Sequence, residues 1–318
     1  MESKTVNVRL SSYGRPLTKL RVSLLDACNF GCVYCMPATA AFCHKEDYLS
    51  SDEISEIVGN LVNYGVEEVR LTGGEPTLRH DLADVVEKLG KLSLKKISLT
   101  TNASRLLQFL PALADGPCRS MNISLDSLEP DNFKKITTHD GLGRVLDTIE
   151  RARAMGFKIK INTVVMKGIN HHEVKNFVRF AERENIEVRF LEVMNIGVVR
   201  PHFQEWHYSG HDILRDIESE FGLSPVQMPA DSTAQVFTTA QGGRVGLIAS
   251  ESMPFCGGCS RLRLSSKGVL RACLMKEDGK NLRGVQPSEY APLLQEIALM
   301  KPMTRIKEIP EPMYQIGG

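Results

Sequence analysis

The stretch Arg21-Val-Ser-Leu-Leu-Asp-Ala-Cys28-Asn-Phe-Gly-Cys32-Val-Tyr-Cys35-Met-Pro37 joins a β-strand pattern to three closely spaced cysteines. Zinc sites and ferredoxin-type clusters use four protein ligands, whereas C-x3-C-x2-C offers three. Three thiolates on a four-iron cluster leave one iron without a protein ligand, and an open coordination position is typical of a catalytic metal site. Two alternatives remain at this point: Cys43 or His44 as a fourth ligand, or a plain zinc or thiol loop.

Strand and helix patterns alternate on both sides of this stretch. Runs typical of strands are Arg21–Leu25, Glu68–Thr72, Lys96–Thr100, Met121–Leu125, Lys158–Val165 and Glu187–Val193. Amphipathic stretches between and after them are Ser51–Tyr64, Asp81–Leu89, Ser104–Leu113, Pro130–Ile136, Leu142–Met155 and His171–Glu184. Six βα units in succession predict an α/β fold with a parallel sheet, a partial, six-unit TIM-like barrel. Two further units that would complete eight are not found, and the site is expected at the carboxyl ends of the strands.

Helix ends carry local signals as well. Ser51 is predicted to cap a helix with an apolar stripe at i, i+3, i+4 and i+7, and Asp81 is predicted to cap the next. Gly65 and Gly156 stand where a helix end favours positive φ.

The pattern changes after residue 197. A helix is predicted at His211–Phe221, followed by short strands at Ala234–Thr239 and Arg244–Ile248. We therefore divide the chain into a barrel core, residues 1–197, and a small C-terminal iron–sulfur cluster-binding region, residues 198–318, packed over the barrel mouth.

Composition indicates an ordinary globular protein, with 42% hydrophobic and 24% charged residues. The net charge of +1 argues against a nucleic-acid surface. No stretch is apolar enough to span a membrane and no secretory signal is evident, so a cytoplasmic location is expected. There thiols stay reduced, and the clustered members of the eight cysteines indicate metal binding rather than disulfides. Cys43 and Cys118 stand alone and are interpreted as small buried hydrophobes.

A second triplet lies near the end of the chain, in Cys256-Gly-Gly-Cys259-Ser-Arg261-Leu-Arg263, with thirteen residues between Cys259 and Cys273. The second triplet again offers three ligands, so one interpretation is a second cluster with an open iron. The other interpretation is a zinc site completed by His202, His207 or His211.

Other residues are predicted to line the same site. Leu71-Thr-Gly-Gly74-Glu-Pro76 closes the second strand, where glycines let the backbone approach a ligand. Arg21, Arg70 and Lys160 lie at or near strands, either as cross-barrel ion pairs or as a phosphate site, to which Thr100 could add a hydroxyl.

The pattern C-x3-C-x-aromatic-C after the first strand of a βα series resembles the radical SAM superfamily. The resemblance implies that S-adenosylmethionine (SAM) chelates the open iron through its amino and carboxylate groups and is reductively split to a deoxyadenosyl radical. It implies SAM contacts at Tyr34, Gly74, Ser124 and Met194.

Both triplets together, the R-x-R after the second and the terminal Gly317-Gly318 closely resemble the family of molybdenum cofactor biosynthesis protein A (MoaA), the GTP 3′,8-cyclases. The family likeness implies two [4Fe-4S] clusters, the second binding the guanine of GTP, and a catalytic role for Gly317 and Gly318. It implies a lyase-type conversion of GTP to (8S)-3′,8-cyclo-7,8-dihydroguanosine 5′-triphosphate. GTP contacts are implied at Arg21, Arg70, Thr100, Lys160, Arg261 and Arg263.

The family also implies partners: flavodoxin or ferredoxin as the reductant, and cyclic pyranopterin monophosphate synthase downstream, with the enzyme a monomer or homodimer. Glu68, Gly31 and Glu311 depart from the family's usual residues, which are basic. These departures leave open a diverged radical SAM enzyme that acts on another nucleotide or a peptide and uses its second cluster for docking.

Overall fold

The computed structural model describes residues 10–316 of the chain, and in this range twelve strands form one sheet in the order β14-β13-β12-β3-β4-β5-β6-β7-β8-β11-β10-β9. Its centre is the predicted series of six parallel strands. They are β3 Lys19–Ser23, β4 Glu68–Thr72, β5 Lys96–Thr101, β6 Ser120–Ser124, β7 Lys158–Val165 and β8 Glu187–Glu192. The six-unit partial barrel is confirmed, with strand ends within two residues of those predicted.

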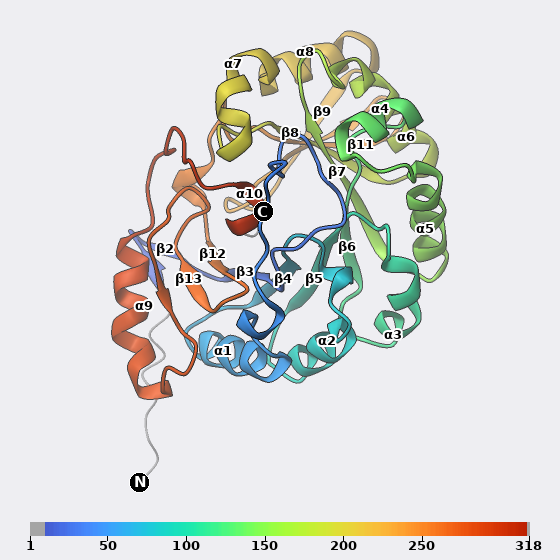
Figure 1. Cartoon of the computed structure of the whole chain (residues 1–318). Helices are drawn as coiled ribbons and strands as arrows, with labels where there is room; N and C mark the ends of the chain where they lie inside the picture. Colours follow the sequence, from blue (N-terminus) through green and yellow to red (C-terminus); the bar gives the residue numbers. More distant parts are fainter. Residues whose placement is uncertain (1–9, 317–318) are drawn as a thin grey trace.

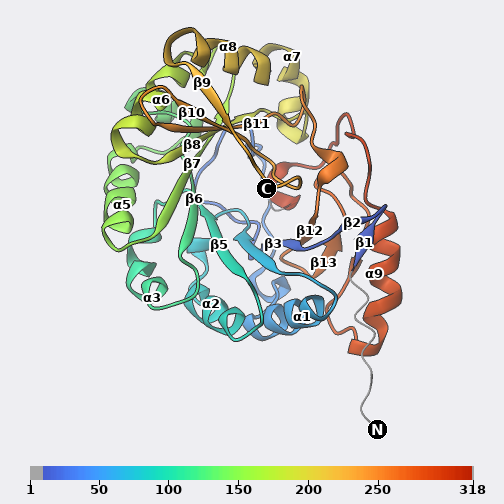
Figure 2. The ribbon, with the colours of Figure 1, turned by 180° about the vertical axis from the view of Figure 1, so that it is seen from behind.

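Helices cover the outer face of this curved sheet (Figures 1 and 2). They are α1 Ser51–Asn63, α2 Leu82–Gly90, α3 Leu110–Ala114, α4 Pro130–Thr137, α5 Leu142–Ala154 and α6 Val174–Glu184. In α1 the stripe Ile54, Ile57, Val58 and Leu61 is buried against the sheet, as its spacing predicts.

The strand pleat decides which side chains face the barrel interior. In β7 the buried residues Ile159, Ile161 and Val165 alternate with Asn162 and Val164, which line the interior cavity. The same alternation brings polar residues from every parallel strand to one enclosed space.

Of the two predicted helix caps, Ser51 is wrong by one residue and Asp81 is right in position but makes no capping hydrogen bond. The first residue of α1 is Ser51, and the residue that caps it is Ser50, which forms a capping box with Glu53. Asp81 occupies the N-cap position of α2 without bonding its backbone, because its carboxylate accepts two hydrogen bonds from Arg79, at 2.6 and 2.9 Å.

Positive φ angles are confirmed at both predicted glycines, 101° at Gly65 and 80° at Gly156. The stretch Ser104–Leu113 is helical only in part, since it contains a 3-10 turn, η3, and the start of the short helix α3. The 3-10 turns of the described range are η1 Lys45–Asp47, η2 Pro76–Leu78, η3 Leu106–Phe109, η4 His171–Glu173, η5 Gly197–His202, η6 Cys256–Gly258 and η7 Pro287–Glu289.

Strands from the second part of the chain extend both edges of the six-stranded centre. β12 Arg261–Leu264 pairs in parallel with β3, and β11 Arg244–Ile248 pairs in parallel with β8. Eight parallel strands therefore stand side by side, although only six belong to the βα series. Antiparallel strands then complete the edges: β13 Val269–Arg271 and β14 Gly279–Asn281 beyond β12, β10 Gln235–Thr239 and β9 Leu223–Val226 beyond β11.

Most of the remaining elements flank these edges: the hairpin β1 Ser11–Ser12 and β2 Arg15–Pro16, and the helices α7 Phe203–Trp206, α8 Gly210–Phe221 and α9 Tyr290–Leu299. The last helix, α10 Met313–Ile316, lies instead near the centre of the barrel (Figures 1 and 2). Both views place the hairpin, α9 and the β12–β13 edge beside one another (Figures 1 and 2). Within residues 10–316, no helix has the length and apolar character needed to cross a membrane.

Glu192, the last residue of β8, ties the two parts of the chain together. Its carboxylate accepts backbone hydrogen bonds from Gly210 at 2.6 Å, Glu251 at 2.6 Å and Ser252 at 3.0 Å. Burial alone would raise its pKa, but the nearby His207 ring, whose Nε2 lies 3.8 Å from the carboxylate, and hydrogen bonds from Ser252 and Gly210 bring it to about 2.

Glu192→Gln is expected to destabilise the protein by about 2–4 kcal/mol at pH 7, because the amide places an NH2 group among N–H donors. The folded pKa lies below the unfolded value, so this contribution is present above about pH 4.5 and is lost as the pH falls toward about 2. Urea unfolding followed by circular dichroism at pH 7 and at pH 3 tests both points. Glu87→Gln, an exposed partner of Lys91, is the control and is expected to change stability by less than about 0.5 kcal/mol. Equal urea midpoints for Glu192→Gln and the wild type would contradict this stabilising role of the Glu192 carboxylate.

Candidate active site

One cavity of 330 Å³ opens at the carboxyl ends of the parallel strands, where the barrel fold predicts a site. Both cysteine triplets line it, although they are more than 200 residues apart in the chain. All the predicted site residues in the described range line it except Lys160. Gly317 and Gly318 lie outside the described residues. Met313 and Tyr314 of α10, shortly before them, line the cavity.

The first triplet is held on a loop that is hydrogen-bonded to the end of α4. The N–H groups of Gly31 and Val33 donate to the carbonyl oxygens of Thr137 at 2.9 Å and Ile136 at 3.0 Å. A Cβ at Gly31 would stand 2.6 Å from the Thr138 hydroxyl oxygen, so a basic side chain there would require Thr138 to move. This contact gives the departure at Gly31 a steric reason.

The surroundings of the first triplet disfavour free thiolates. Burial raises the pKa of Cys28 to about 11, with the Glu75 carboxylate adding to the shift, and burial raises that of Cys35 to about 12. Burial followed by the Asp126 carboxylate raises the pKa of Cys32. These thiols therefore need a bound metal to displace their protons.

The second triplet has a cationic environment. Burial would raise the pKa of Cys259, but the positive charges of Arg261 and then Lys301 bring it below the ordinary thiol value. Cys256 is raised by burial. The two triplets thus face the same cavity from electrostatically different walls.

The spacing of the sulfur atoms fits a cluster better than a single ion. Neither described triplet brings all three of its sulfur atoms within 4.8 Å of one another. The sulfur ligands of one tetrahedral zinc ion, at bonds of 2.3 Å, would lie about 3.8 Å apart. None of His202, His207 and His211 lines the cavity, and the same holds for Cys43 and His44. Each triplet therefore offers three cysteine ligands in an arrangement suited to an iron–sulfur cluster.

Tyr34 is fixed by a carboxylate that the sequence reasoning did not single out. Its hydroxyl donates to Asp126 at 2.8 Å, and Asp126 also accepts from the Val164 N–H at 2.8 Å. Burial raises the pKa of Asp126 to about 6. The available signal was its position two residues after Ser124, at the end of a predicted strand.

Five arginines from four strands also line the cavity: Arg21, Arg70, Arg189, Arg261 and Arg263. Burial, followed by the charges of Arg189 and Arg261, lowers the pKa of Arg70 to about 10. Burial and the charges of Arg263, Arg70 and Arg261 lower the pKa of Arg21. Such mutual repulsion is relieved by an anion, and guanidinium groups match phosphate oxygens.

The predicted contact Lys160 does not line the cavity, whereas Arg189, which sequence reasoning did not single out, does. Lys160 lies on the inward side of β7, nearer its amino end, and its ammonium donates to Glu187 at 2.7 Å. Arg189 also donates to Glu187, at 2.6 Å, and reaches the cavity. Arg189 was missed because it follows Glu187 at i+2, a spacing that reads as a plain ion pair until the strand is placed in the barrel.

The two remaining departures lie beside basic residues, and Glu311 forms an ion pair with one of them. Glu68 lies in register between Lys19 of β3 and Lys96 of β5. Glu311 binds Arg271 through two hydrogen bonds, at 2.7 and 3.0 Å. Neither carboxylate lines the cavity.

Gly74 is required by a close backbone approach. A Cβ at this position would stand 2.1 Å from the Ala27 carbonyl oxygen and 2.5 Å from that of Asp26, in the loop that carries the first triplet. Since both obstacles are backbone atoms, no side-chain movement can relieve the clash.

Gly74→Ala is therefore expected to displace the cysteine loop and weaken SAM binding at least about tenfold, a loss of about 1.4 kcal/mol. Equilibrium dialysis with SAM on the reconstituted protein measures this. The matched control is Gly143→Ala in α5, where an added Cβ meets nothing within 4 Å, and which is expected to bind SAM normally and gain up to about 1 kcal/mol in stability. Unchanged SAM affinity in Gly74→Ala would show that the loop tolerates the shift.

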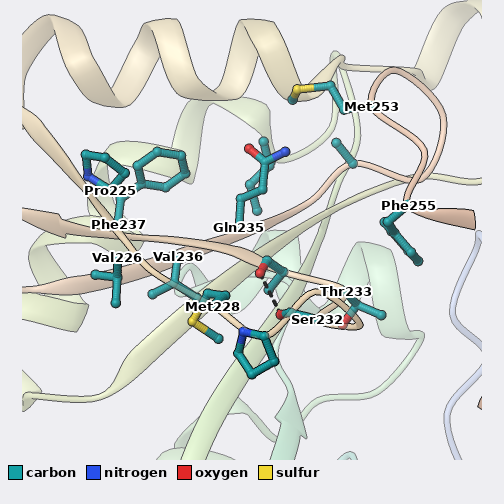
Figure 3. A pocket seen from close by; sticks show the side chains of 14 residues that line it. Pro225, Val226, Met228, Ser232, Thr233, Gln235, Val236, Phe237, Met253 and Phe255 are labelled. Atoms are coloured by element: carbon teal, nitrogen blue, oxygen red, sulfur yellow. Dashed lines mark hydrogen bonds between the residues drawn. The ribbon is translucent and has the colours of Figure 1, made fainter. Parts of the chain in front are cut away.

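A second, apolar hollow adjoins the first between β9, β10 and the loop before η6 (Figure 3). Thr233 and Phe255 line both spaces. Its other labelled side chains include Val226, Met228 and Phe237, and no acidic, basic or cysteine residue lines it. It therefore offers packing surface rather than a reactive group.

Comparison with protein families finds two matches. Residues 22–181 match the Radical SAM superfamily, and residues 186–303 match the family described as Molybdenum Cofactor Synthesis C.

Curated relatives match nearly the whole chain. The chain is 46% identical to a GTP 3′,8-cyclase of Synechocystis sp., covering 99% of this chain and 96% of the relative. It is 35% identical to a GTP 3′,8-cyclase of Aquifex aeolicus, covering 97% and 99%. In fold it is similar to Streptococcus suis SuiB bound to S-adenosylmethionine, with a TM-score of 0.65, 14% identity, and coverage of 92% of this chain and 68% of SuiB.

Proposed function

The chain belongs to the radical SAM superfamily and, within it, to the GTP 3′,8-cyclase family, and from this membership we infer that it is a radical SAM GTP 3′,8-cyclase of molybdenum cofactor biosynthesis. Its reaction converts GTP to (8S)-3′,8-cyclo-7,8-dihydroguanosine 5′-triphosphate. Iron–sulfur clusters and SAM are its cofactors.

The observation that carries this function is one cavity lined by two cysteine triplets and six arginines, five of them on strands and the sixth Arg305. A radical generator needs one triplet only. The second triplet and the arginines supply what a nucleoside triphosphate substrate requires: a metal for the base and guanidinium groups for the phosphates.

We assign Cys28, Cys32 and Cys35 to the first [4Fe-4S] cluster and Tyr34, Gly74, Ser124 and Met194 to SAM. When bound, this cluster supplies an open iron and the electron that splits SAM into methionine and a deoxyadenosyl radical. The protein holds the cysteine loop against the end of α4 by hydrogen bonds, and it buries the three thiols away from water. Asp126 accepts the Tyr34 hydroxyl proton in a hydrogen bond and so orients the ring.

We assign Cys256, Cys259 and Cys273 to the second [4Fe-4S] cluster, which would hold the guanine. Arg21, Arg70, Thr100, Lys160, Arg261 and Arg263 are assigned to GTP, with Arg189 added because it reaches the cavity. Relief of repulsion among these guanidinium groups by the triphosphate favours binding.

We assign residues 1–197 to the radical SAM core, residues 198–318 to the second cluster region, and a catalytic role to Gly317 and Gly318. A flavodoxin or ferredoxin would supply electrons and a cyclic pyranopterin monophosphate synthase would take the product, in the cytoplasm, with the enzyme a monomer or homodimer.

Anaerobic incubation of the reconstituted enzyme with SAM, dithionite and GTP tests the function. We expect 5′-deoxyadenosine and loss of GTP in equal amounts, and little conversion of ATP or of guanosine, which lack the guanine and the triphosphate respectively. Deoxyadenosine without GTP consumption, under conditions that support a characterised relative, would favour the diverged enzyme acting on a peptide or another nucleotide.

A further inference from the structure

Lys301, just after α9, is the only buried lysine among residues 10–316, with 2% of its surface exposed. Burying an ammonium group is costly unless it is paired and hydrogen-bonded. No carboxylate pairs with Lys301 among the described residues. Its surroundings therefore have to supply another compensation.

The Lys301 ammonium bridges the two segments that carry the last two cysteines. It donates to the Arg261 carbonyl oxygen at 2.6 Å and to the Ala272 carbonyl oxygen at 2.8 Å. Arg261 follows Cys259 by two residues, and Ala272 directly precedes Cys273. One side chain thus sets the separation of two predicted cluster ligands.

Lys301 also lines the cavity, as do all three cysteines of the second triplet. Its positive charge therefore faces the space in which a cluster held by these cysteines would lie. The charged side chains beside the first triplet include carboxylates, Glu75 near Cys28 and Asp126 near Cys32 and Cys35.

A second buried cation, Arg15 of the N-terminal hairpin, secures the segment from outside. Its guanidinium donates to the Cys256 carbonyl oxygen at 2.6 Å and to the Pro302 carbonyl oxygen at 3.2 Å. Arg15 and Lys301 together therefore contact backbone next to, or at, all three cysteines of the second triplet. The hairpin lies against this edge of the sheet in both views (Figures 1 and 2).

We propose that Lys301 is a positioning residue for the second cluster, whose ammonium fixes the Cys259 and Cys273 segments and whose positive charge raises the reduction potential of the cluster bound there. The proposal rests on the assignment of Cys256, Cys259 and Cys273 as cluster ligands. Reduction adds one electron, taken from a strong one-electron donor such as dithionite, and makes the cluster and its thiolates more negative by one charge. A fixed cation beside the thiolates stabilises that added charge, and the carboxylates beside the first triplet do the opposite.

The experiment isolates the second cluster in the full-length chain. In a background with Cys28, Cys32 and Cys35 replaced by alanine, the variants Lys301→Met, Lys301→Gln and Lys301→Arg are reconstituted, iron and sulfide are counted, and the cluster is titrated by EPR against potential. We expect Lys301→Met and Lys301→Gln to lower the ratio of reduced to oxidised cluster about tenfold at a fixed potential, which corresponds to 59 mV for one electron. Lys301→Arg keeps the charge and is expected to stay within about threefold of the parent.

Two controls accompany these variants. Lys95→Met removes an exposed lysine at the amino end of β5, paired with Glu67, and is expected to leave the titration unchanged. Lys301→Met in the reciprocal background, with Cys256, Cys259 and Cys273 replaced by alanine, is expected to leave the first cluster's potential unchanged.

Each outcome decides the proposal. Loaded Lys301→Gln with an unchanged potential overturns the charge effect. Loss of the cluster in Lys301→Met and Lys301→Gln but not in Lys301→Arg supports a required cation. Loss in all three variants overturns the proposal and makes Lys301 a packing residue. If the Cys28, Cys32 and Cys35 triple-alanine protein with Lys301 unchanged holds zinc or no iron, the assignment of Cys256, Cys259 and Cys273 as cluster ligands fails. That result is distinct from a failure of the Lys301 proposal, which appears only in the Lys301 variants.

Discussion

Replacing Cys28, Cys32 and Cys35 together by alanine is expected to abolish 5′-deoxyadenosine formation, a loss of at least about 10³-fold, since enzymes accelerate such reactions by 10⁶ or more. The three thiols are buried with raised pKa values and have carboxylates, not cations, as charged neighbours. No other cysteine of residues 10–316 reaches this part of the cavity to replace them. The iron content should fall from about eight to about four per chain.

Anaerobic reconstitution followed by iron counting and by chromatography of SAM products measures both effects. Cys43→Ala is the matched control, because Cys43 is close in sequence but does not line the cavity, and its backbone N–H donates to Asp26 at 3.0 Å. It should keep about eight irons and full deoxyadenosine formation. A loss of iron in Cys43→Ala would instead make Cys43 the fourth ligand, and the open iron would disappear from the scheme.

Replacing Cys256, Cys259 and Cys273 together by alanine is expected to separate the two half-reactions. GTP conversion should fall at least about 10³-fold, since the guanine loses its metal and the substrate its alignment. SAM cleavage driven by dithionite should persist, because the loop of the first triplet is hydrogen-bonded to the end of α4 and none of the three substituted cysteines belongs to that contact. Deoxyadenosine would then accumulate without loss of GTP.

Iron content again gives the control, with about four irons expected in this variant as well as in the first. Retention of GTP conversion would contradict a substrate role for the second triplet. Zinc in place of iron at Cys256, Cys259 and Cys273 in the wild type would contradict the two-cluster arrangement itself.

Local sequence signals were enough for the six βα units. Strand pleat and helix period are properties of neighbouring residues, so the stripe of α1 and the alternation in β7 can be read without knowing the fold. The carboxyl-end rule then placed Cys28, Gly74 and Ser124 at one opening, because each directly ends or follows a strand. Capping hydrogen bonds were harder to predict, because the Asp81 carboxylate accepts from Arg79, only two residues away, instead of from the helix backbone.

Residues whose role depends on a partner far along the chain escaped sequence reasoning. In the sequence, Arg189 resembles one half of a surface ion pair, and only its place on β8 in the barrel shows that it lines the cavity. The role of Asp126 follows only from its hydrogen bond with the Tyr34 hydroxyl, 92 residues away. Lys301 carries no motif, and its two acceptors lie 40 and 29 residues back. Hydrogen-bond partners at such separations leave no periodic trace in the sequence.

The sequence by itself determined the cysteine triplets, their three-ligand character and the six parallel strands, because spacing and periodicity are local. Only the tertiary structure decided that β12 and β11 continue the same sheet in parallel at its two edges, so that both triplets open onto one cavity. It also decided the charge around each triplet, carboxylates near Cys32 and cations near Cys259. Arg261 lies only two residues after Cys259, but Asp126 and Lys301 come from segments distant in the chain, and no spacing along the sequence encodes their approach to the cysteines.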